Sequence, residues 1–275
     1  MYKGHTVSVV IPALNEEGAI GIVVEQLRAL QHDGQAIFDH IQVCDNGSTD
    51  NTTNVAKSAG ASVVYQEISG YGIACLTALS ALPLSDIVLF VDGDDACFME
   101  QSIALLDGIV KGDDLAIGSR NLGIIEPGAL TQTQIFGNWL SSHLITLFWG
   151  QKITDLGPFR AIRSSALTTI NMQDKTFGWT VEMQVKAIIH GMKVSEYPVD
   201  SKVRIGESKI SGTIKGSIRA GIGILSMIGK LYFQQSKLKK TVLNKSEHSL
   251  QQSNQQQNNL QQNNHKSKDT ELSHD

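Results

Sequence analysis

Three aspartates stand together in the segment Asp92-Gly-Asp94-Asp95, directly after the apolar run Ile87 to Val91. Carboxylates grouped at the end of a buried strand repel one another unless a cation or hydrogen-bond donors compensate their charge. Such oxygen ligands suit Mg²⁺ or Mn²⁺, which usually keep water molecules and bridge to substrate phosphates. A solvated turn is the alternative, because Asp and Gly both favour turns. The segment therefore predicts either a metal-assisted phosphate site or a simple turn.

Two further polar loops also follow β-branched runs. They are Pro12-Ala-Leu-Asn-Glu16 and Asp45-Asn-Gly-Ser-Thr-Asp50. Asp45 could accept a hydrogen bond from a nucleotide base, while the loop and the helix start behind it hold polar parts of the nucleotide. The same residues also suit helix starts, since Ser48 to Asp50 makes a good N-cap and Glu16 a first-turn acid. Both interpretations are compatible with one another.

The elements that position these loops alternate between short apolar runs and segments of helical spacing. The predicted strands cover residues 7–11, 41–44, 62–65, 86–91, 115–120 and 193–197. The predicted helices cover residues 20–30, 52–59, 70–82, 134–149 and 180–190. This alternation predicts an α/β fold with a mostly parallel sheet, in which ligands lie at the carboxyl ends of the strands. The three polar loops should therefore converge.

Composition excludes several classes of protein. The 275 residues carry 23 Lys and Arg against 27 Asp and Glu, a formal charge of -4, so general nucleic-acid binding is disfavoured. Three cysteines form neither a disulfide framework nor a zinc motif, and a cytoplasmic location fits best. The apolar stretch from Ile218 to Phe233 is interrupted by Arg219 and Lys230, so no membrane-spanning helix is expected.

Taken together, the motifs resemble those of the catalytic domain of glycosyltransferase family 2, which has the Rossmann-like GT-A fold. The resemblance is closest to the branch of dolichyl-phosphate mannose and polyprenyl-phosphate hexose synthases. It runs from about residue 7 to residue 214 and rests on the segments Val9-Val-Ile-Pro-Ala-Leu-Asn-Glu16, Asp45-Asn-Gly-Ser-Thr-Asp50, Gly70-Tyr-Gly72, Val91-Asp-Gly-Asp94, Gly118-Ser-Arg120, Asp155-Leu-Gly-Pro-Phe-Arg160 and Arg204-Ile-Gly-Glu-Ser-Lys209.

The resemblance implies a metal-dependent transfer of a hexosyl unit from a UDP- or GDP-sugar, with Mg²⁺ or Mn²⁺ as cofactor. Asp94, with Asp92, would hold the metal that bridges the diphosphate, and Arg204 and Lys209 would contact the phosphates during catalysis. An exposed, solvated loop is the alternative for these two cations. The residues implied to bind the nucleotide sugar are Pro12, Ala13, Asn15, Glu16, Asp45, Ser48, Gly72, Asp92, Gly93, Arg120 and Ser208.

Asp155 and Glu182 are the candidates on the acceptor side. A hydroxyl acceptor needs a carboxylate to take its proton, and either residue could do this. A lipid phosphate is already anionic, so Asp155 could then order the site while Arg120, Arg160 or Arg163 binds the acceptor phosphate. The alternatives are a capping role for Asp155 and an ordinary helix-surface charge for Glu182.

Two positions depart from the family pattern. Ala96 stands where many relatives carry Gln two residues after the metal-binding Asp, and Ile73 stands where the Gly-rich turn usually has a basic residue. These departures concern the identity of donor and acceptor more than the reaction class. They also keep open a nucleotide-sugar-binding protein without catalysis.

The expected organisation is one GT-A domain over residues 1–213, an amphipathic helical segment over 214–243 and a disordered Gln/Asn-rich tail over 244–275. The helical segment could lie at the inner membrane surface or dock on the domain. The preferred acceptor is a polyprenyl phosphate at that surface, and the alternative is a soluble sugar or small hydroxyl compound. A homo-oligomer or a membrane-protein partner is compatible with this organisation.

Overall fold

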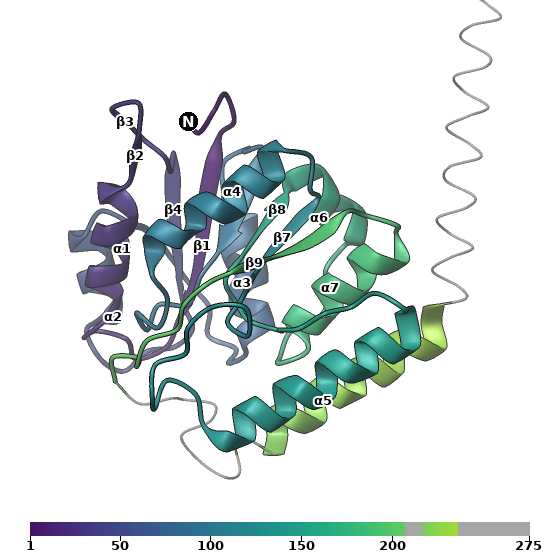
Figure 1. The fold of residues 1–275 in the computed structure, drawn as a ribbon. Helices are drawn as coiled ribbons and strands as arrows, with labels where there is room; N and C mark the ends of the chain where they lie inside the picture. The colour runs from purple at the N-terminus through teal and green to yellow at the C-terminus, as the bar shows by residue number, and fades with distance from the viewer. Residues whose placement is uncertain (207–215, 217, 236–275) are drawn as a thin grey trace, which may run out of the picture. The chain divides into compact units, whose positions relative to one another are not determined.

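The computed structural model describes residues 1–206, 216 and 218–235 (Figure 1). Within these residues, seven strands form one sheet, and β2 (Gln31–His32) pairs with β3 (Gln35–Ala36) in a separate hairpin. The strands of the sheet, in spatial order, are β5 (Ser62–Tyr65), β4 (His40–Asp45), β1 (Val7–Ala13), β6 (Ile87–Phe90), β8 (Arg160–Arg163), β7 (Leu115–Ser119) and β9 (Val194–Pro198). The predicted α/β fold with a mostly parallel sheet is confirmed.

Strand β8 is the exception to the parallel arrangement. It pairs antiparallel with β6 on one side and with β7 on the other, whereas β1, β4, β5 and β6 pair in parallel, as do β7 and β9. All strands except β8 therefore point their carboxyl ends toward the same edge of the sheet. The loops after β1, β4 and β6 meet at that edge.

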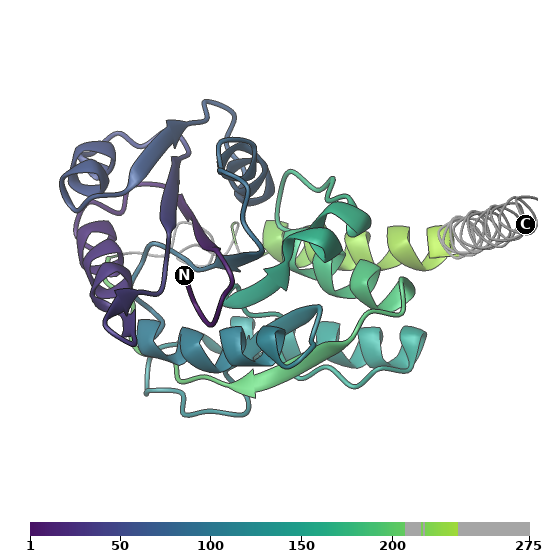
Figure 2. The same ribbon diagram turned by 90° about the horizontal axis from the view of Figure 1, so that it is seen from above.

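Helices cover both faces of the sheet (Figures 1 and 2). Alternate residues of β1 enter different cores: Val9 packs with α1 (Ile20–Ala29), α2 (Thr52–Ser58) and α4 (Ser102–Val110). Val10 packs with α3 (Tyr71–Ser80), α6 (Ser164–Ile170) and α7 (Trp179–Ile189) on the other face. This burial on both faces explains why the strands are continuously apolar.

Helix α5 (Gln132–Trp149) begins with a capping box between Thr131 and Gln134 and ends at Gly150, whose φ of 74° is left-handed. A second helix runs beside it over residues 218–232 (Figure 1). The ring centroids of Phe148 and Tyr232 lie 4.6 Å apart. Residues Met1–Tyr232 form one compact unit. The predicted tail over 244–275 lies outside the described residues.

Five elements of the structure were not predicted from the sequence, and they are α4, α6, β8 and the two short strands β2 and β3. The segment Met99–Gln101 also forms a short 3-10 helix before α4. The remaining predicted helices and strands are present with ends shifted by a few residues, as for the helix predicted at 134–149, which begins at Gln132.

Candidate active site

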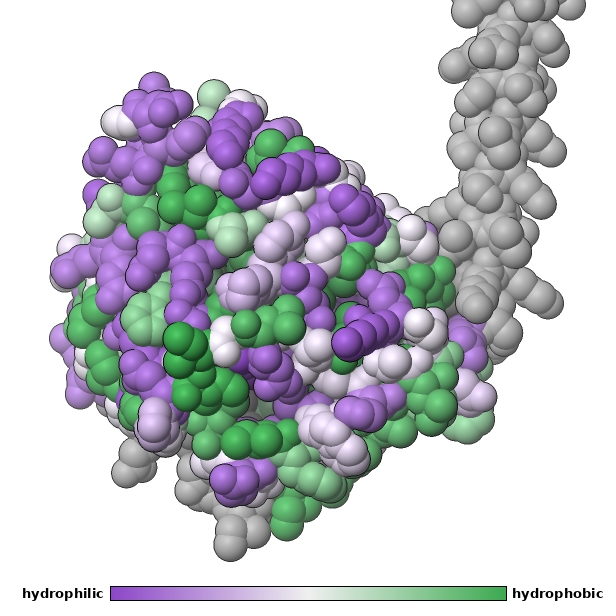
Figure 3. All heavy atoms as spheres, viewed as in Figure 1, coloured by the Kyte–Doolittle hydropathy of each residue, from purple (hydrophilic) through white to green (hydrophobic). Residues whose placement is uncertain are grey.

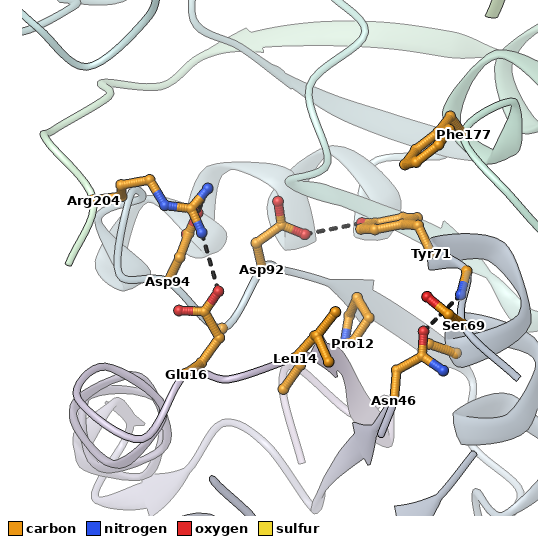
Figure 4. Close-up of a pocket in the computed structure, with 14 residues that line it drawn as sticks. Pro12, Leu14, Glu16, Asn46, Ser69, Tyr71, Asp92, Asp94, Phe177 and Arg204 are labelled. Atoms are coloured by element: carbon orange, nitrogen blue, oxygen red, sulfur yellow. Dashed lines mark hydrogen bonds and ion pairs between the residues drawn. The ribbon is translucent and has the colours of Figure 1, made fainter. Parts of the chain in front are cut away.

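A pocket opens at the edge of the sheet where the carboxyl ends of β1 and β6 meet the start of α3 (Figure 4). Seven residues predicted from the sequence line it, and they are Pro12, Ala13, Glu16, Asp92, Gly93, Asp94 and Arg204. The other lining residues are Leu14, Asn46, Ser69, Gly70, Tyr71, Ala74 and Phe177. The predicted convergence of polar loops is thus present for the first and third loops and for Asn46 of the second.

Arg204 joins two acidic residues of the pocket. Its guanidinium lies 3.1 Å from Asp94 Oδ2 and 3.0 Å from Glu16 Oε1 (Figure 4). Backbone bonds hold the Arg204 segment in place, because the Ile205 N–H donates to the Asp94 carbonyl and the Lys202 N–H to the Ala96 carbonyl. The cation is therefore fixed beside the carboxylates, although 188 residues separate Arg204 from Glu16.

Asp92 carries a perturbed carboxyl group at the centre of the pocket. Burial, and then the negative charge of Asp94, raises the pKa of Asp92 to about 7, against a smaller lowering effect of the hydrogen bond from Tyr71. The Tyr71 hydroxyl donates to Asp92 Oδ1 over 3.0 Å. A buried carboxyl group that resists ionisation beside a second carboxylate forms a site in which a cation would be stabilised.

The pair Asp92 and Asp94 fits a divalent cation that takes its remaining ligands from phosphate oxygens and water. No group of three or more metal-ligating side chains exists within residues 1–206 and 218–235, so these residues form no all-protein cage. Asp95 does not line the pocket, and its carboxylate forms an ion pair with Lys202 Nζ at 2.9 Å. Mg²⁺ and Mn²⁺ are the ions that accept such an open oxygen site.

Asn15, Asp45 and Ser48 do not line the pocket but tie the first two loops together. The Ser48 hydroxyl accepts from the Asn15 N–H at 2.9 Å, and the Asn15 side chain accepts from the Thr49 N–H at 2.7 Å. Asp45 accepts from the Ser48 N–H and from the Thr53 hydroxyl. Their observed contacts shape the loops beside the pocket.

Gly72, predicted to bind the nucleotide sugar, does not line this pocket and lies against a neighbouring backbone segment. Its N–H donates to the Thr176 carbonyl over 3.1 Å, and a Cβ atom at this position would lie 2.2 Å from the Asp174 carbonyl oxygen. The neighbouring segment therefore lies where a side chain at this position would stand. The glycine is needed here for close backbone approach.

Asp155 is fully buried and pairs with Arg120. Its two oxygens accept from the Arg120 backbone N–H at 2.7 Å, from Nε at 2.8 Å and from a terminal nitrogen at 2.7 Å. Burial lowers the pKa of Arg120, but the Asp155 carboxylate outweighs this effect and holds that pKa above its ordinary value. Neither residue lines the pocket. The observed geometry is that of an ordering pair.

Glu182 is not the helix-surface charge that one interpretation expected. Only 2% of it is exposed, because it lies behind the segment between α6 and α7 and faces backbone N–H groups there. Arg160 is also fully buried and donates to the carbonyls of Leu156, Gly157 and Thr180, and burial lowers its pKa to about 10. Its hydrogen-bonding groups face the backbone.

The expectation that Arg163 could bind an acceptor phosphate is wrong. Because β8 is antiparallel, its last residue lies opposite Ile87, at the amino end of β6 and away from the pocket. The Arg163 side chain donates to the carbonyls of Ile109 and Asp113. The direction of one unpredicted strand thus removes this candidate.

Sequence reasoning missed seven of the lining residues, among them the polar or aromatic side chains of Asn46, Tyr71 and Phe177. Asn46 stands in the motif Asp45–Asp50 and Tyr71 in the motif Gly70–Gly72, so both could have been assigned to the pocket from the sequence. No motif pointed to Phe177 as a pocket residue. The Asn46 side chain accepts from the Gly70 N–H at 2.8 Å and donates to two carbonyls, which fixes the start of α3. Ser208 and Lys209, predicted to contact the nucleotide sugar, lie outside the described residues.

The family model of glycosyl transferase family 2 matches residues 8–170. The hexosyltransferase Agl6 of low-salt glycan biosynthesis in Haloferax volcanii is 32% identical over 208 residues, which are 74% of this chain and 50% of that protein. A dolichyl-phosphate hexose transferase of the same organism is 32% identical over 212 residues, 76% of this chain and 88% of that protein.

Solved structures agree on the fold. Glucosyl-3-phosphoglycerate synthase from Mycobacterium tuberculosis, in complex with Mn²⁺, UDP and phosphoglyceric acid, superposes with a TM-score of 0.65 and 24% identity. The match covers 82% of this chain and 79% of that one. With the family model matching more than half of the chain, the pocket at the carboxyl ends of β1 and β6 lies in a protein that belongs to glycosyltransferase family 2.

Proposed function

We propose that this chain is a metal-dependent hexosyltransferase that moves a hexosyl unit from a nucleoside diphosphate sugar to a polyprenyl phosphate. The observation that carries the proposal is the meeting of Asp92, Asp94 and Arg204 in one pocket of a family 2 protein. An anionic diphosphate leaving group needs positive charge beside it, and these residues could supply an ion site and a fixed cation.

Asp92 and Asp94 would hold Mg²⁺ or Mn²⁺, and the ion would stabilise negative charge on the diphosphate as the glycosidic bond breaks. Arg204 would turn from Asp94 and Glu16 toward the phosphates. Ser208 and Lys209 are proposed to act beside it, as the motif implies. Pro12, Ala13, Asn46 and Gly93 would form the walls around the nucleotide, with Asn15, Asp45 and Ser48 holding the loops that carry them.

A lipid-phosphate acceptor requires no general base, because its oxygen is already anionic near neutral pH. This agrees with the observed environments of Asp155 and Glu182, whose carboxylates are occupied by buried donors. Asp155 would then keep Arg120 in place, and inversion at the anomeric carbon is part of the proposal. The name of the Haloferax relative, a dolichyl-phosphate hexose transferase, supports this acceptor class.

Two adjacent helices, α5 and the helix over residues 218–232, present an apolar surface that supports action at a membrane. Helix α5 has no Asp, Glu, Lys or Arg, and Phe136, Trp139 and Leu147 on it are exposed. Hydrophobic side chains gather on the molecular surface in the region of α5 (Figure 3). On the second helix the exposed apolar side chains recur at spacings of four, three and seven residues, namely Ile218, Ile222, Leu225 and Tyr232. We propose that this surface lies on the bilayer, with Arg219 and Lys230 near acidic headgroups.

The described helices contain no segment of the length and apolarity that a bilayer crossing requires. A second candidate acceptor is a small hydroxyl compound, which the structural likeness to a glucosyl-3-phosphoglycerate synthase favours. That reaction would need a carboxylate freed from its present partners to accept the hydroxyl proton.

The test incubates purified protein with Mn²⁺ or Mg²⁺, a polyprenyl phosphate and a panel of radiolabelled nucleotide sugars, and then counts label extracted into organic solvent. Metal-dependent label in that phase is expected. Label transferred only to 3-phosphoglycerate or another water-soluble acceptor would replace the lipid acceptor, and an intact donor in every reaction would contradict the transferase assignment.

The Asp94→Asn variant should lose activity by about a thousandfold or more, because one proposed metal ligand and one of the two carboxylate partners of Arg204 disappear together. Asp33→Asn is the matched control, since the Asp33 side chain is 89% exposed and lies in the turn between β2 and β3. Full activity of Asp94→Asn would contradict the metal assignment.

A further inference from the structure

A buried ion pair lies outside the pocket, on helix α7. Lys186 Nζ approaches Glu182 Oε1 to 2.7 Å, and the two side chains are only 10% and 2% exposed. Taking both charges out of water costs free energy that the attraction between them alone does not always repay. The other hydrogen bonds of Glu182 and Lys186 must therefore help to offset this cost.

Both residues bind the backbone of the segment that joins α6 to α7, residues 171–178. The Glu182 carboxylate accepts from the Gln173 N–H at 3.0 and 3.1 Å and from the Asp174 N–H at 2.7 Å. Lys186 Nζ donates to the Asn171 carbonyl at 2.7 Å. Charge-assisted bonds of this kind are roughly twice as strong as neutral ones, so α7 holds the segment firmly.

The segment in turn holds the first turn of α3. Its carbonyls at Lys175 and Thr176 accept from the N–H groups of Ile73 and Gly72, over 3.0 and 3.1 Å. The contact is close, because a Cβ atom at Gly70 would lie 2.3 Å from the Lys175 carbonyl oxygen. A displacement of the segment by one ångström would therefore move the start of α3 or break these bonds.

Two pocket residues belong to the first turn of α3 and to the segment over residues 171–178. Tyr71, in the first turn of α3, donates its hydroxyl proton to Asp92, and Phe177, at the end of the segment, forms part of the pocket wall (Figure 4). A continuous set of contacts thus runs from Glu182 through the segment and α3 to the carboxylate of Asp92.

We propose that Glu182, with Lys186, is a positioning residue that fixes Tyr71 against Asp92 and Phe177 in the pocket wall, and so sets the affinity for the metal-bound nucleoside diphosphate. The ligand in this statement rests on the proposed function, whereas the mechanical link does not. Glu182 does not touch the reacting atoms, since its oxygens face two backbone N–H groups and an ammonium.

The mechanical link is tested in the free protein by hydrogen–deuterium exchange. Glu182→Gln keeps the size of the side chain but loses its charge, and it should speed exchange in the peptide over residues 70–76 by about tenfold. Val185→Ala is the matched control, because Val185 is fully buried on the same helix but bonds to nothing in the segment. Equal exchange over 70–76 in the two variants would overturn the inference.

The consequence for the pocket is tested by calorimetric titration of Mn²⁺ with UDP and, in a second series, with GDP. Glu182→Gln and Tyr71→Phe should each weaken binding by about tenfold, and the double variant should be hardly weaker than either, since both act through the same contact. Additive losses would overturn the inference, as would a loss equal to that of Val185→Ala. Lys186→Met provides a second route to the same loosened segment.

Steady-state kinetics of the Glu182→Gln variant distinguish a positioning role of Glu182 from a role as general base. A positioning role predicts that Glu182→Gln raises the KM for the donor more than it lowers kcat, with an unchanged pH profile, whereas loss of a base would lower kcat and remove the acidic limb of the profile. If the unaltered protein bound neither UDP nor GDP, the proposed function would fail, and the exchange experiment would still decide the inference.

Discussion

Replacing Asp155 by Asn should destabilise the protein strongly, because the change removes the negative charge that balances a largely buried guanidinium. Asp155 is fully buried, and its two oxygens accept three hydrogen bonds from Arg120, at 2.7, 2.8 and 2.7 Å. An amide offers one oxygen instead of two, so its NH₂ group would face an Arg120 donor. The guanidinium would remain largely buried, with a 20% exposed side chain and no carboxylate to balance it.

The expected cost is about 3 to 5 kcal/mol, the range found when one partner of a buried ion pair is removed. This is a large share of the roughly 5 to 15 kcal/mol by which domains are stable. With a urea dependence of about 2.5 kcal/mol per molar, the midpoint of unfolding should fall by about 1.5 M.

The assay is urea unfolding followed by circular dichroism, with activity measured in parallel below the transition. Asp33→Asn makes the same chemical change at an exposed carboxylate and should shift stability by no more than about 0.5 kcal/mol. The reasoning would be refuted by an Asp155→Asn protein as stable as the unaltered one. Such a protein with activity reduced by a hundredfold or more would instead identify Asp155 as a general base.

Two other perturbations test the pocket itself. Since the pKa of Asp92 is about 7 and a bound cation needs the carboxylate, Mn²⁺ affinity of the free protein should fall up to tenfold per unit as the pH drops below 7. Titrations at pH 6 and 8 check this, and equal affinities would contradict it. Gly72→Ala should cost about 2 to 4 kcal/mol of stability, because its Cβ atom would meet the Asp174 carbonyl at 2.2 Å. Urea unfolding measures the loss, which Gly137→Ala, with open space around it, should not show.

Much of the fold could be predicted because its strands are short, β-branched and buried on both faces. Runs such as Val7 to Ile11 leave little choice of structure, and the helices between them show the spacing of one buried stripe. Strand β8 escaped prediction for the opposite reason. The sequence Arg-Ala-Ile-Arg places a charge at each end of four residues, and only the tertiary contacts of Arg160 and Arg163 make these ends compatible with burial.

Some features of the candidate site could likewise be predicted from the sequence, and others could not. Asp92, Asp94, Glu16 and Arg204 could be predicted, since each stands in a polar motif at a strand end or in a basic loop. The backbone segment beside Gly72 could not be predicted, because a glycine in a sequence does not reveal which neighbour approaches it. Glu182 and Asp155 were recognised as important carboxylates, but their burial and their partners depend on segments far away in the chain.

The antiparallel strand β8 has a consequence for the order in which the chain assembles during synthesis. It lies between β6, which ends at Phe90, and β7, which ends at Ser119, yet it begins only at Arg160. Until the ribosome has released residue 163, β6 is an open edge of four buried apolar residues. Open apolar edges pair with other chains, so a translational pause or a premature stop between residues 119 and 160 would leave the nascent protein most exposed to aggregation.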